Sequence, residues 1–260
     1  MKKIIKKLNQ IAQINGFSMK VFLLSIRGIP LFLSNLLSYQ IAFRKNGGMG
    51  LQFSNLFPVM ADRYDSAGVA NGHYFFQDLW AAKKIYSIKP YKHVDIGSSV
   101  MGFVSHLLVF MECVEVVDVR SLESKVDQLI FIQDDGTYLK SYADNSLESV
   151  SSLHAAEHFG LGRYGDPIDP LAHAKFMNSL ARVLKPGGRL YFSVPTGIER
   201  LEFNAHRVLS PATVLNCFSS LDLISFSLVK DDGYIYENAS LEDAALQSYG
   251  CGLYEFSKKL

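Results

Sequence analysis

The sequence predicts an α/β protein whose mostly parallel sheet has helices on both faces, preceded by a helical N-terminal extension. From residue 90 onwards, short apolar runs alternate with helical patterns, as expected of strands that crossover helices connect. Several runs are almost continuously apolar, which is typical of parallel strands covered on both faces. The seven expected strands cover residues 93–96, 114–119, 129–132, 147–153, 189–194, 223–229 and 253–256.

Two helices are expected where apolar residues recur at helical spacing. The first covers residues 74–86 and places Phe75, Leu79 and Tyr86 on one face, and the second covers residues 171–184. An Asn-Gly turn precedes the first helix, and a Lys-Pro-Gly-Gly turn ends the second.

Composition limits the classes of partner and compartment. Hydrophobic residues make up 48% of the 260 residues and charged residues 20%, which allows a sizeable core and disfavours disorder. The formal net charge of +1 gives no field that would concentrate nucleic acid. The three cysteines are an odd number without ligand-like spacing, which indicates a reducing compartment and no disulfide framework. We therefore expect a cytoplasmic protein with no nucleic-acid partner and no metal site.

The N-terminal arm, residues 1–50, differs from the α/β domain, residues 51–260. It opens with four lysines and continues through apolar patches. Such a segment could form a helix that rests on an anionic membrane surface at its inner face. The favoured alternative is a helical arm packed on the domain or on a second subunit of a homo-oligomer. The longest uncharged run, residues 28–43, is shorter than the roughly 20 residues of a bilayer span.

The loop after the first expected strand suits a nucleotide-type ligand. Gly97 lets the backbone approach a ligand at the carboxyl edge of the sheet, where open α/β sheets bind ligands. Asp95, one residue before the end of the strand, could orient the loop or contact a cationic group of the ligand. The loop has one glycine where a dinucleotide fingerprint has three, so an ordinary strand and turn explains this loop about as well.

Acidic residues at the ends of the next two strands strengthen the ligand interpretation. Asp118 is placed to accept both hydroxyl groups of a ribose, although an ion pair with Arg120 is an alternative. Asp135 follows the third strand and could accept the exocyclic amine of adenine, or simply be solvated. We expect Gly97 and Asp118 to hold an adenosine between them.

Three motifs resemble those of class I S-adenosylmethionine-dependent methyltransferases. An Asp-Asn-Ser-Leu-Glu run at 144–148 enters the fourth strand, Glu157 and His158 follow it, and an Arg-Val-Leu-Lys-Pro-Gly-Gly run at 182–188 turns into the fifth. Their order and spacing match over about residues 90–195. The resemblance implies a Rossmann-like, seven-stranded sheet and S-adenosylmethionine as the cofactor, with Leu153 among the residues that contact it.

The chain from about residue 58 to 259 more closely resembles a group within that superfamily, the "domain of unknown function 268" proteins. The resembling stretches are residues 73–80, 93–98, 160–167 and 204–207. Bacterial members look associated with surface-polysaccharide synthesis, which implies a glycan or sugar-bearing acceptor. This chain departs from the superfamily in its glycine loop, where Ser98 and Ser99 can still offer N–H and hydroxyl groups to a ligand carboxylate.

Candidate catalytic residues follow the fourth strand. Methyl transfer depends mainly on alignment, and a hydroxyl acceptor also benefits from a general base. His158 is the first choice for that base and His154 the second, with Glu157 between them. The alternative is that this histidine only bonds nearby backbone. Glu157 and His158 lack a third neighbouring ligand, so they predict no metal site.

Candidate acceptor-binding residues lie in two loops. The insert at 160–170 is rich in glycine and proline, so it is irregular and lies at the rim of the expected site. Within it Arg163 could bind a phosphate or carboxylate, Tyr164 could stack on a sugar, and Asp166 is grouped with them. The alternative is a structural loop that starts the next helix. After the fifth strand, His206 and Arg207 could face an anionic acceptor.

The sequence therefore predicts an S-adenosylmethionine-dependent methyltransferase, with O-methylation of a sugar, a glycan or a related small acceptor in surface-polysaccharide synthesis. A second hypothesis is a catalytically degenerate binding or scaffold protein at the membrane surface. A third is another nucleotide-sugar transferase that uses the same crevice, because a fold does not fix a function. A dehydrogenase is disfavoured because a pyrophosphate needs the missing glycines.

Overall fold

The computed structural model describes residues 11–260 and divides the chain into two compact units, residues 1–69 and 70–260. The lysines at positions 2, 3, 6 and 7 lie outside the described residues. The division at residue 69 lies beyond the boundary at residue 50 that the sequence suggested, because the segment after the long helix of the first unit packs back on that helix.

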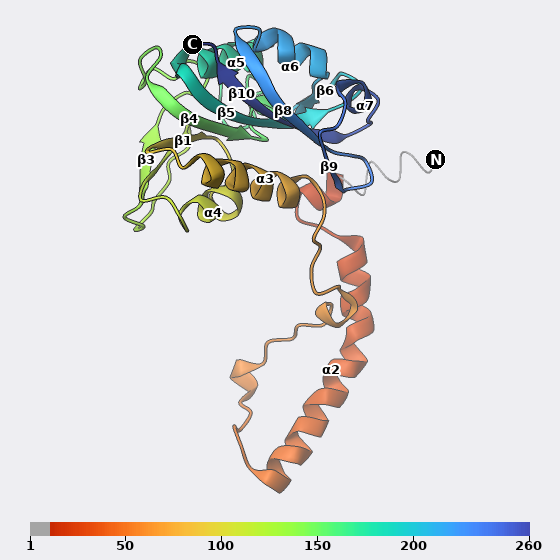
Figure 1. The fold of residues 1–260 in the computed structure, drawn as a ribbon. Coiled ribbons are helices and arrows are strands. Elements are labelled where there is room, and N and C mark those ends of the chain that lie inside the picture. The colour runs from red at the N-terminus through yellow and green to blue at the C-terminus, as the bar shows by residue number, and fades with distance from the viewer. Residues whose placement is uncertain (1–10) are drawn as a thin grey trace. The chain divides into compact units, whose positions relative to one another are not determined.

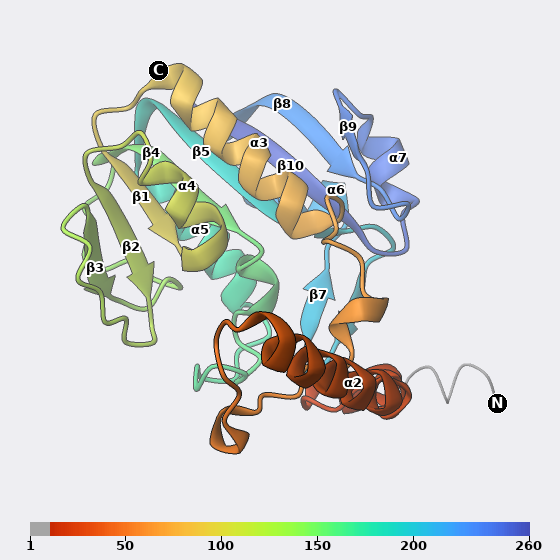
Figure 2. The same cartoon turned by 90° about the horizontal axis from the view of Figure 1, so that it is seen from below.

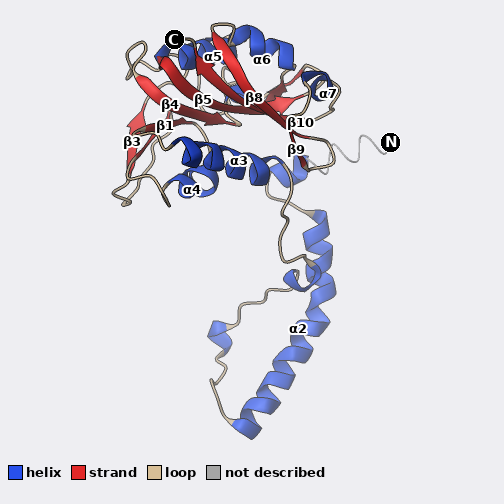
Figure 3. Cartoon of the chain, in the orientation of Figure 1, coloured by secondary structure: helices blue, strands red, loops and turns tan. Residues whose placement is uncertain are grey.

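The second unit contains one large sheet, and every predicted strand is part of it (Figure 3). Its order is β3-β2-β1-β4-β5-β10-β8-β9, so it has eight strands within the described residues where seven were predicted. The eighth, β9, is short and pairs at the edge with β8. The strands are β1 (His93–Ile96), β2 (Val114–Asp118), β3 (Leu129–Gln133), β4 (Leu147–Leu153), β5 (Leu184–Thr196), β8 (Leu221–Val229), β9 (Ile235–Glu237) and β10 (Gly250–Lys258). A separate hairpin joins β6 (Arg200–Glu202) and β7 (His206–Val208).

The sheet is mostly parallel, as predicted, and its topology creates a ligand-binding edge. Strands β1 to β5 run parallel to one another, whereas β10 runs antiparallel to both β5 and β8. The strand order reverses between β1 and β4, and in open α/β sheets such a switch point opens a crevice at the carboxyl ends of the strands.

Helices cover both faces of the sheet, again as predicted (Figure 1). Figure 2 shows α3 and α4 across one face. On that face Ile85 and Phe103 pack with Val116, and on the other face Phe176 packs with Phe192. The helices are α3 (His73–Ile88), a π-helix (Val100–Val104), α4 (Ser105–Leu107), α5 (Ala172–Val183), α6 (Pro211–Cys217) and α7 (Leu241–Ala245).

The buried face of α3 is rotated from the predicted one. Phe75 and Tyr86 are exposed, whereas Gln77 and Asp78 are buried together with Ile85. Gln77 is stabilised there because its amide oxygen accepts a hydrogen bond from the Ser193 hydroxyl, and its amide nitrogen donates to Asp78. A count of apolar residues alone could not place these two polar side chains inside.

The described part of the first unit consists of residues 11–18, α2 (Met19–Asn46) and the segment that follows α2. Ser18 caps the start of the helix, and the helix continues through Pro30. Met60 lies against Gly28, where a Cβ atom would collide with its carbonyl oxygen, and the Arg27 guanidinium lies 4.9 Å from the Tyr64 ring centroid. The return segment, which includes two 3₁₀ turns, thus covers one side of the helix.

Among the helices of residues 11–260, α2 is long and apolar enough, by length and composition, to cross a membrane. The helix has 28 residues and is therefore longer than the uncharged run at residues 28–43, because it continues past Arg27 toward the N-terminus. Only 6% of its most apolar window is buried within the described residues.

Candidate functional site

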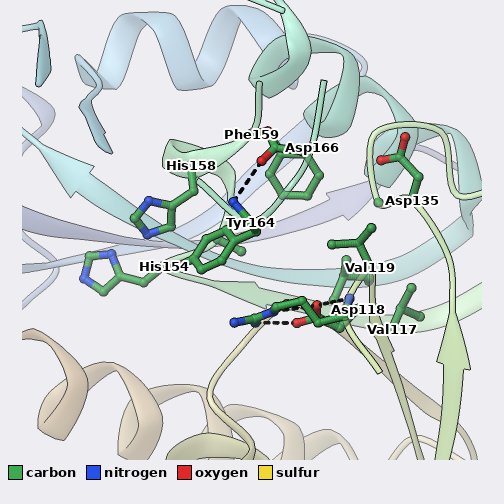
Figure 4. Close-up of a pocket in the computed structure, with 14 residues that line it drawn as sticks. Val117, Asp118, Val119, Asp135, His154, His158, Phe159, Tyr164 and Asp166 are labelled. Atoms are coloured by element: carbon green, nitrogen blue, oxygen red, sulfur yellow. Dashed lines mark hydrogen bonds and ion pairs between the residues drawn. The ribbon is translucent and has the colours of Figure 1, made fainter. Parts of the chain in front are cut away.

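A crevice opens at the carboxyl edge of the sheet, beyond the ends of β1 to β4 (Figure 4). Its volume is about 640 Å³, including its open mouth. Gly97, Asp118 and Asp135 line it from three successive strand ends, and His154 and His158 line it from the exit of β4. The structure therefore places the two residues proposed to hold adenosine on one crevice.

Gly97 gives this crevice its close backbone wall. Its φ of +72° lies in the left-handed region, which glycine adopts without steric cost. Its N–H donates to the Val117 carbonyl at 3.0 Å, and an added Cβ atom would lie 3.1 Å from the Cβ atom of Ala155. A side chain here would be strained and would crowd the crevice.

Asp95 and Ser98 build the loop from inside and do not line the crevice. Asp95 is fully buried, and its carboxylate accepts hydrogen bonds from the Ser98 N–H at 3.1 Å and from the Ser98 and Ser151 hydroxyls at 2.6 Å each. Burial raises the pKa of Asp95 to about 6, against the effect of these hydrogen bonds. Asp95 thus orients the loop, the first of the two roles considered for it.

Ser99 and Leu153 also lie outside the crevice lining. The Ser99 hydroxyl accepts from the Gly102 N–H at 3.1 Å and caps the π-helix. Leu153 is buried in the core on the α3 side, and its N–H donates to the Ser98 hydroxyl at 2.9 Å. The side chains of Ser98, Ser99 and Leu153 are thus not among those that line the crevice, and the Ser98 and Ser99 backbone follows directly on Gly97.

Asp118 is paired with Arg120, the alternative that the sequence left open. Its Oδ1 accepts from the Arg120 backbone N–H at 2.8 Å and from Nε at 3.0 Å, and its Oδ2 accepts from Nη2 at 2.7 Å. The Arg120 guanidinium also lies 4.5 Å from the Tyr164 ring centroid. Figure 4 shows Asp118 at the crevice, with the Tyr164 ring nearby.

The crevice walls beyond Asp118 are apolar. Val119 and Phe159 line it, and Phe159 stacks flat on Phe176 with ring centroids 4.1 Å apart. Asp135 accepts from the Thr137 N–H at 2.9 Å, which leaves its second oxygen for a ligand. Gly136 is also required, since a Cβ atom there would lie 2.9 Å from the Phe159 ring. The sequence interpretation missed Val119, Gly136 and Phe159. Each directly follows a predicted site residue in the sequence, and that position was the signal that could have identified it.

His158 presents a neutral imidazole to the crevice. Its Nδ1 donates to the Ala205 carbonyl at 2.7 Å, so Nε2 carries the lone pair of a neutral ring. Burial lowers the pKa of His158 from 6.5, partly offset by the nearby Glu157. The ring therefore both bonds backbone, as the alternative held, and keeps one basic nitrogen.

His154 sits in a strained backbone position at the end of β4. Its φ is +52°, which is uncommon for a residue with a side chain and costs on the order of 1 kcal/mol. Its Nδ1 lies 2.8 Å from Oε1 of Glu157, which is buried behind the crevice. Burial opposes a charge on His154, but Cys251 and Glu157 raise its pKa well above 6.5.

A group of potential metal ligands meets at His154, although the sequence predicted no metal site. His73, His154 and Cys251 each offer a ligand atom, and these three atoms lie within 4.8 Å of one another. They come from the start of α3, the exit of β4 and the start of β10. The prediction missed them because the residues are far apart in the sequence and show no ligand spacing.

The insert after β4 reaches the crevice through Tyr164 and Asp166. The Asp166 carboxylate is already used to hold the loop, since it accepts from the N–H groups of Gly160 at 2.7 Å and Tyr164 at 3.2 Å. Arg163 does not line the crevice; it donates to the Ala205 carbonyl at 3.1 Å and lies 5.2 Å from the Tyr164 ring centroid. Two guanidinium groups, those of Arg120 and Arg163, thus lie against the Tyr164 ring.

His206 and Arg207 do not line the crevice either. Arg207 is 7% exposed and donates to the carbonyls of Glu157 at 3.3 Å and Phe159 at 2.7 Å, so it fixes the exit of β4. The His206 ring lies against Tyr249, with centroids 5.1 Å apart. In this arrangement the Arg207 guanidinium does not face the crevice in which an anionic acceptor would bind.

The sequence matches the profile of a family described as "Caenorhabditis protein of unknown function, DUF268" over residues 85–248, more than half of the chain. No curated protein matches the chain.

Three solved structures illustrate the shared fold. The cyclase SpnF has a TM-score of 0.52 at 11% identity, covering 72% of this chain and 81% of its own. The 1,6-didemethyltoxoflavin-N1-methyltransferase of Burkholderia thailandensis, solved with bound S-adenosylhomocysteine, has 0.50 at 14%, covering 71% and 79%. The YcgJ protein of Bacillus subtilis has 0.50 at 16%, covering 71% and 99%. At these identities the likeness confirms the predicted class I methyltransferase-like fold.

Proposed function

The chain belongs to the DUF268 family, and we propose that it is an S-adenosylmethionine-dependent methyltransferase. The observation that carries the proposal is the crevice at the switch point of the sheet, with Gly97 and Asp118 on neighbouring strand ends. One neighbour with this fold holds S-adenosylhomocysteine, which supports the cofactor, while the cyclase SpnF illustrates that the fold alone does not fix the reaction.

The chemistry of the crevice lining supports the proposal. Asp118 is placed for the ribose hydroxyls, the apolar walls at Val119 and Phe159 suit an adenine ring, and Asp135 suits its exocyclic amine. When bound, the cofactor supplies an electrophilic methyl group, and the chain needs only to align it with a nucleophile.

Ribose binding requires Asp118 to release the Arg120 side chain. The Arg120 guanidinium already lies against the Tyr164 ring, so that contact can retain it after the ion pair opens. Asp118 and Arg120 are partly exposed, and an ion pair in such surroundings contributes little to stability. The exchange of one partner for the other is therefore inexpensive.

We extend the proposal to a sugar or glycan hydroxyl as the acceptor, in surface-polysaccharide synthesis. His158 offers a basic nitrogen for a hydroxyl proton. Tyr164 also lines the crevice, and a sugar ring that stacks on it would replace one of the two guanidinium groups now against its ring. The resemblance of the chain to polysaccharide-associated proteins supports the same acceptor class.

Calorimetry with S-adenosylmethionine and S-adenosylhomocysteine tests the cofactor. We expect binding of one molecule per chain, and methyl transfer from methyl-labelled cofactor to at least one member of a panel of sugars and nucleotide sugars. Heat from neither cofactor form would contradict the proposal. Binding without transfer to any acceptor would favour the scaffold hypothesis, and heat from nucleotide sugars alone would favour another transferase.

We also propose that α2 holds the protein at the inner face of a membrane, in the cytoplasm. Exposed apolar side chains recur every three or four residues along one stripe of α2, from Phe22 through Ile29 and Leu33 to Ile41. The return segment packs at Gly28, off this stripe. Lys20, Arg44 and Lys45 add positive charge near the helix ends, which suits anionic lipid.

Sedimentation of the full chain with lipid vesicles tests this membrane contact. The double variant Ile29→Asp/Leu33→Asp should lose binding to phosphatidylserine-containing vesicles, because two charges would enter the apolar stripe. The matched variant Asn35→Asp/Ser38→Asp adds the same charge at exposed polar positions and should bind much better than the stripe variant. Equal binding by the two variants would exclude the stripe as the contact, and a dimer without vesicle binding would assign it to a second copy.

A further inference from the structure

Two histidine rings face each other beside a buried cysteine, next to the crevice but behind its wall. His73 Nδ1 lies 3.1 Å from His154 Nε2, and the sulfur of Cys251 lies within 4.8 Å of both nitrogens. His154 and Cys251 are buried and His73 is half-buried. This trio joins the first turn of α3 to the adjacent ends of β4 and β10.

The outer nitrogens of both rings have partners that can only accept a hydrogen bond. His73 Nε2 lies 3.1 Å from the carbonyl oxygen of Tyr249, so this nitrogen must carry the hydrogen. His154 Nδ1 lies 2.8 Å from the Glu157 carboxylate, so it carries the hydrogen as well. A neutral ring has one N–H, so when both rings are neutral the two inner nitrogens present lone pairs to each other.

Two lone pairs 3.1 Å apart repel unless a cation lies between them. We infer that His73, His154 and Cys251 bind a divalent transition-metal ion of the zinc class. Zinc–nitrogen bonds of about 2.0–2.1 Å at tetrahedral angles place two ligand nitrogens roughly 3.3 Å apart, close to the separation found here. Two imidazoles and a thiolate are a donor set that such ions prefer.

The surroundings are built as those of metal-binding histidines are. In metal sites the second ring nitrogen donates to a carboxylate or a backbone carbonyl, which fixes the ring and its tautomer. Glu157 serves His154 in this way and the Tyr249 carbonyl serves His73. The charges also balance, since a divalent cation offsets the Cys251 thiolate and the buried Glu157 carboxylate.

The competing occupant of the space between the rings is a single proton. A proton on His154 Nε2 would donate to His73 Nδ1 and would pair with Glu157, which also removes the repulsion. The proton needs no sulfur, however, whereas the site places Cys251 next to both nitrogens. Three protein ligands leave a fourth position for water or an acceptor oxygen, as in catalytic zinc sites. Because His154 also lines the crevice, the ion would lie at its edge.

Cobalt titration of the full, chelator-treated chain tests the metal site with no need for methyl transfer. We expect one equivalent of Co²⁺, the visible absorption of tetrahedral cobalt, and a thiolate-to-cobalt band that Zn²⁺ displaces. Zinc should also raise the unfolding temperature. A folded chain that binds no Co²⁺, and whose unfolding temperature zinc does not change, would assign the space to a proton and overturn the inference.

Variants separate the three ligands from general effects on the fold. Cys251→Ser should abolish the thiolate band, whereas Cys217→Ser, which changes a partly buried cysteine outside this group, should keep it. Glu157→Gln should weaken the metal affinity about 10- to 100-fold, the usual effect of losing such a hydrogen-bond partner. Should Cys251→Ser fail to fold, His73→Ala at the half-buried start of α3 decides the matter. Unchanged cobalt affinity in His73→Ala would refute the site.

Discussion

Replacing Asp118 with alanine is expected to weaken the binding of S-adenosylhomocysteine about 10- to 100-fold, without unfolding the chain. In the proposed complex the carboxylate accepts hydrogen bonds from the ribose hydroxyls, and hydrogen bonds to charged groups are worth about 1.5–3 kcal/mol each. Part of that gain is lost because Asp118 must first release Arg120, with which it forms three hydrogen bonds. Calorimetry on the wild type and the variant measures the difference.

The Arg120→Ala variant is the matched control for this prediction. It removes the residue that competes for the Asp118 carboxylate, so cofactor affinity should stay the same or rise. The two variants together distinguish a ribose-binding Asp118 from an ion pair that only shapes the loop. An Asp118→Ala affinity equal to that of the wild type, or a larger loss in Arg120→Ala, would rule out the assignment.

The strands were predictable because their signals are local. A run such as residues 129–132 is wholly apolar, and it needs no knowledge of distant residues to be recognised as a strand. The edge strand β9 was missed because Ile235–Glu237 is short and mostly exposed. The face of α3 was misplaced because buried Gln77 accepts a hydrogen bond from Ser193, which is far along the chain, and apolar periodicity does not report such a contact.

The candidate site was predictable where topology alone decides it. Parallel strands end at the same edge, which brings Gly97, Asp118 and Asp135 to one crevice whatever the loops do. Side-chain direction is a different matter. Asp95 and Ser98 point inward because the Asp95 carboxylate accepts hydrogen bonds from the Ser98 and Ser151 hydroxyls. Arg207 points away from the crevice lining because it donates to two backbone carbonyls that only the folded chain brings near it.

The exit of β4 connects these observations. His154 adopts a left-handed backbone conformation there, and the buried Glu157 follows it. Arg207 donates a hydrogen bond to the Glu157 carbonyl. His158 donates one to the Ala205 carbonyl, which also fixes this turn. Strained backbone tends to persist where the surroundings over-determine it, which is common at functional sites. Both candidate histidines therefore owe their orientation to one rigid turn.

His158→Ala is expected to lower kcat for methyl transfer to a hydroxyl acceptor about 10²- to 10⁴-fold, the usual contribution of a general base. Cofactor affinity should change little, because the ring nitrogen that remains free, Nε2, is assigned to the acceptor proton. Rates measured at saturating cofactor, with calorimetry on the same samples, separate the two quantities. His106→Ala, which removes an exposed histidine of α4, should leave kcat unchanged.

The pH dependence of the methyl-transfer rate provides an independent test of His158 as the general base. Burial lowers the pKa of His158 from 6.5, so the ring is neutral at pH 7 and can accept a proton. The rate of the wild type should therefore be flat around neutral pH and fall only as the pH drops below 6.5, when imidazolium replaces the base. A rate that falls already above pH 7 would not fit a base of lowered pKa. Loss of cofactor affinity and kcat together in His158→Ala would instead assign the ring to holding the turn after β4.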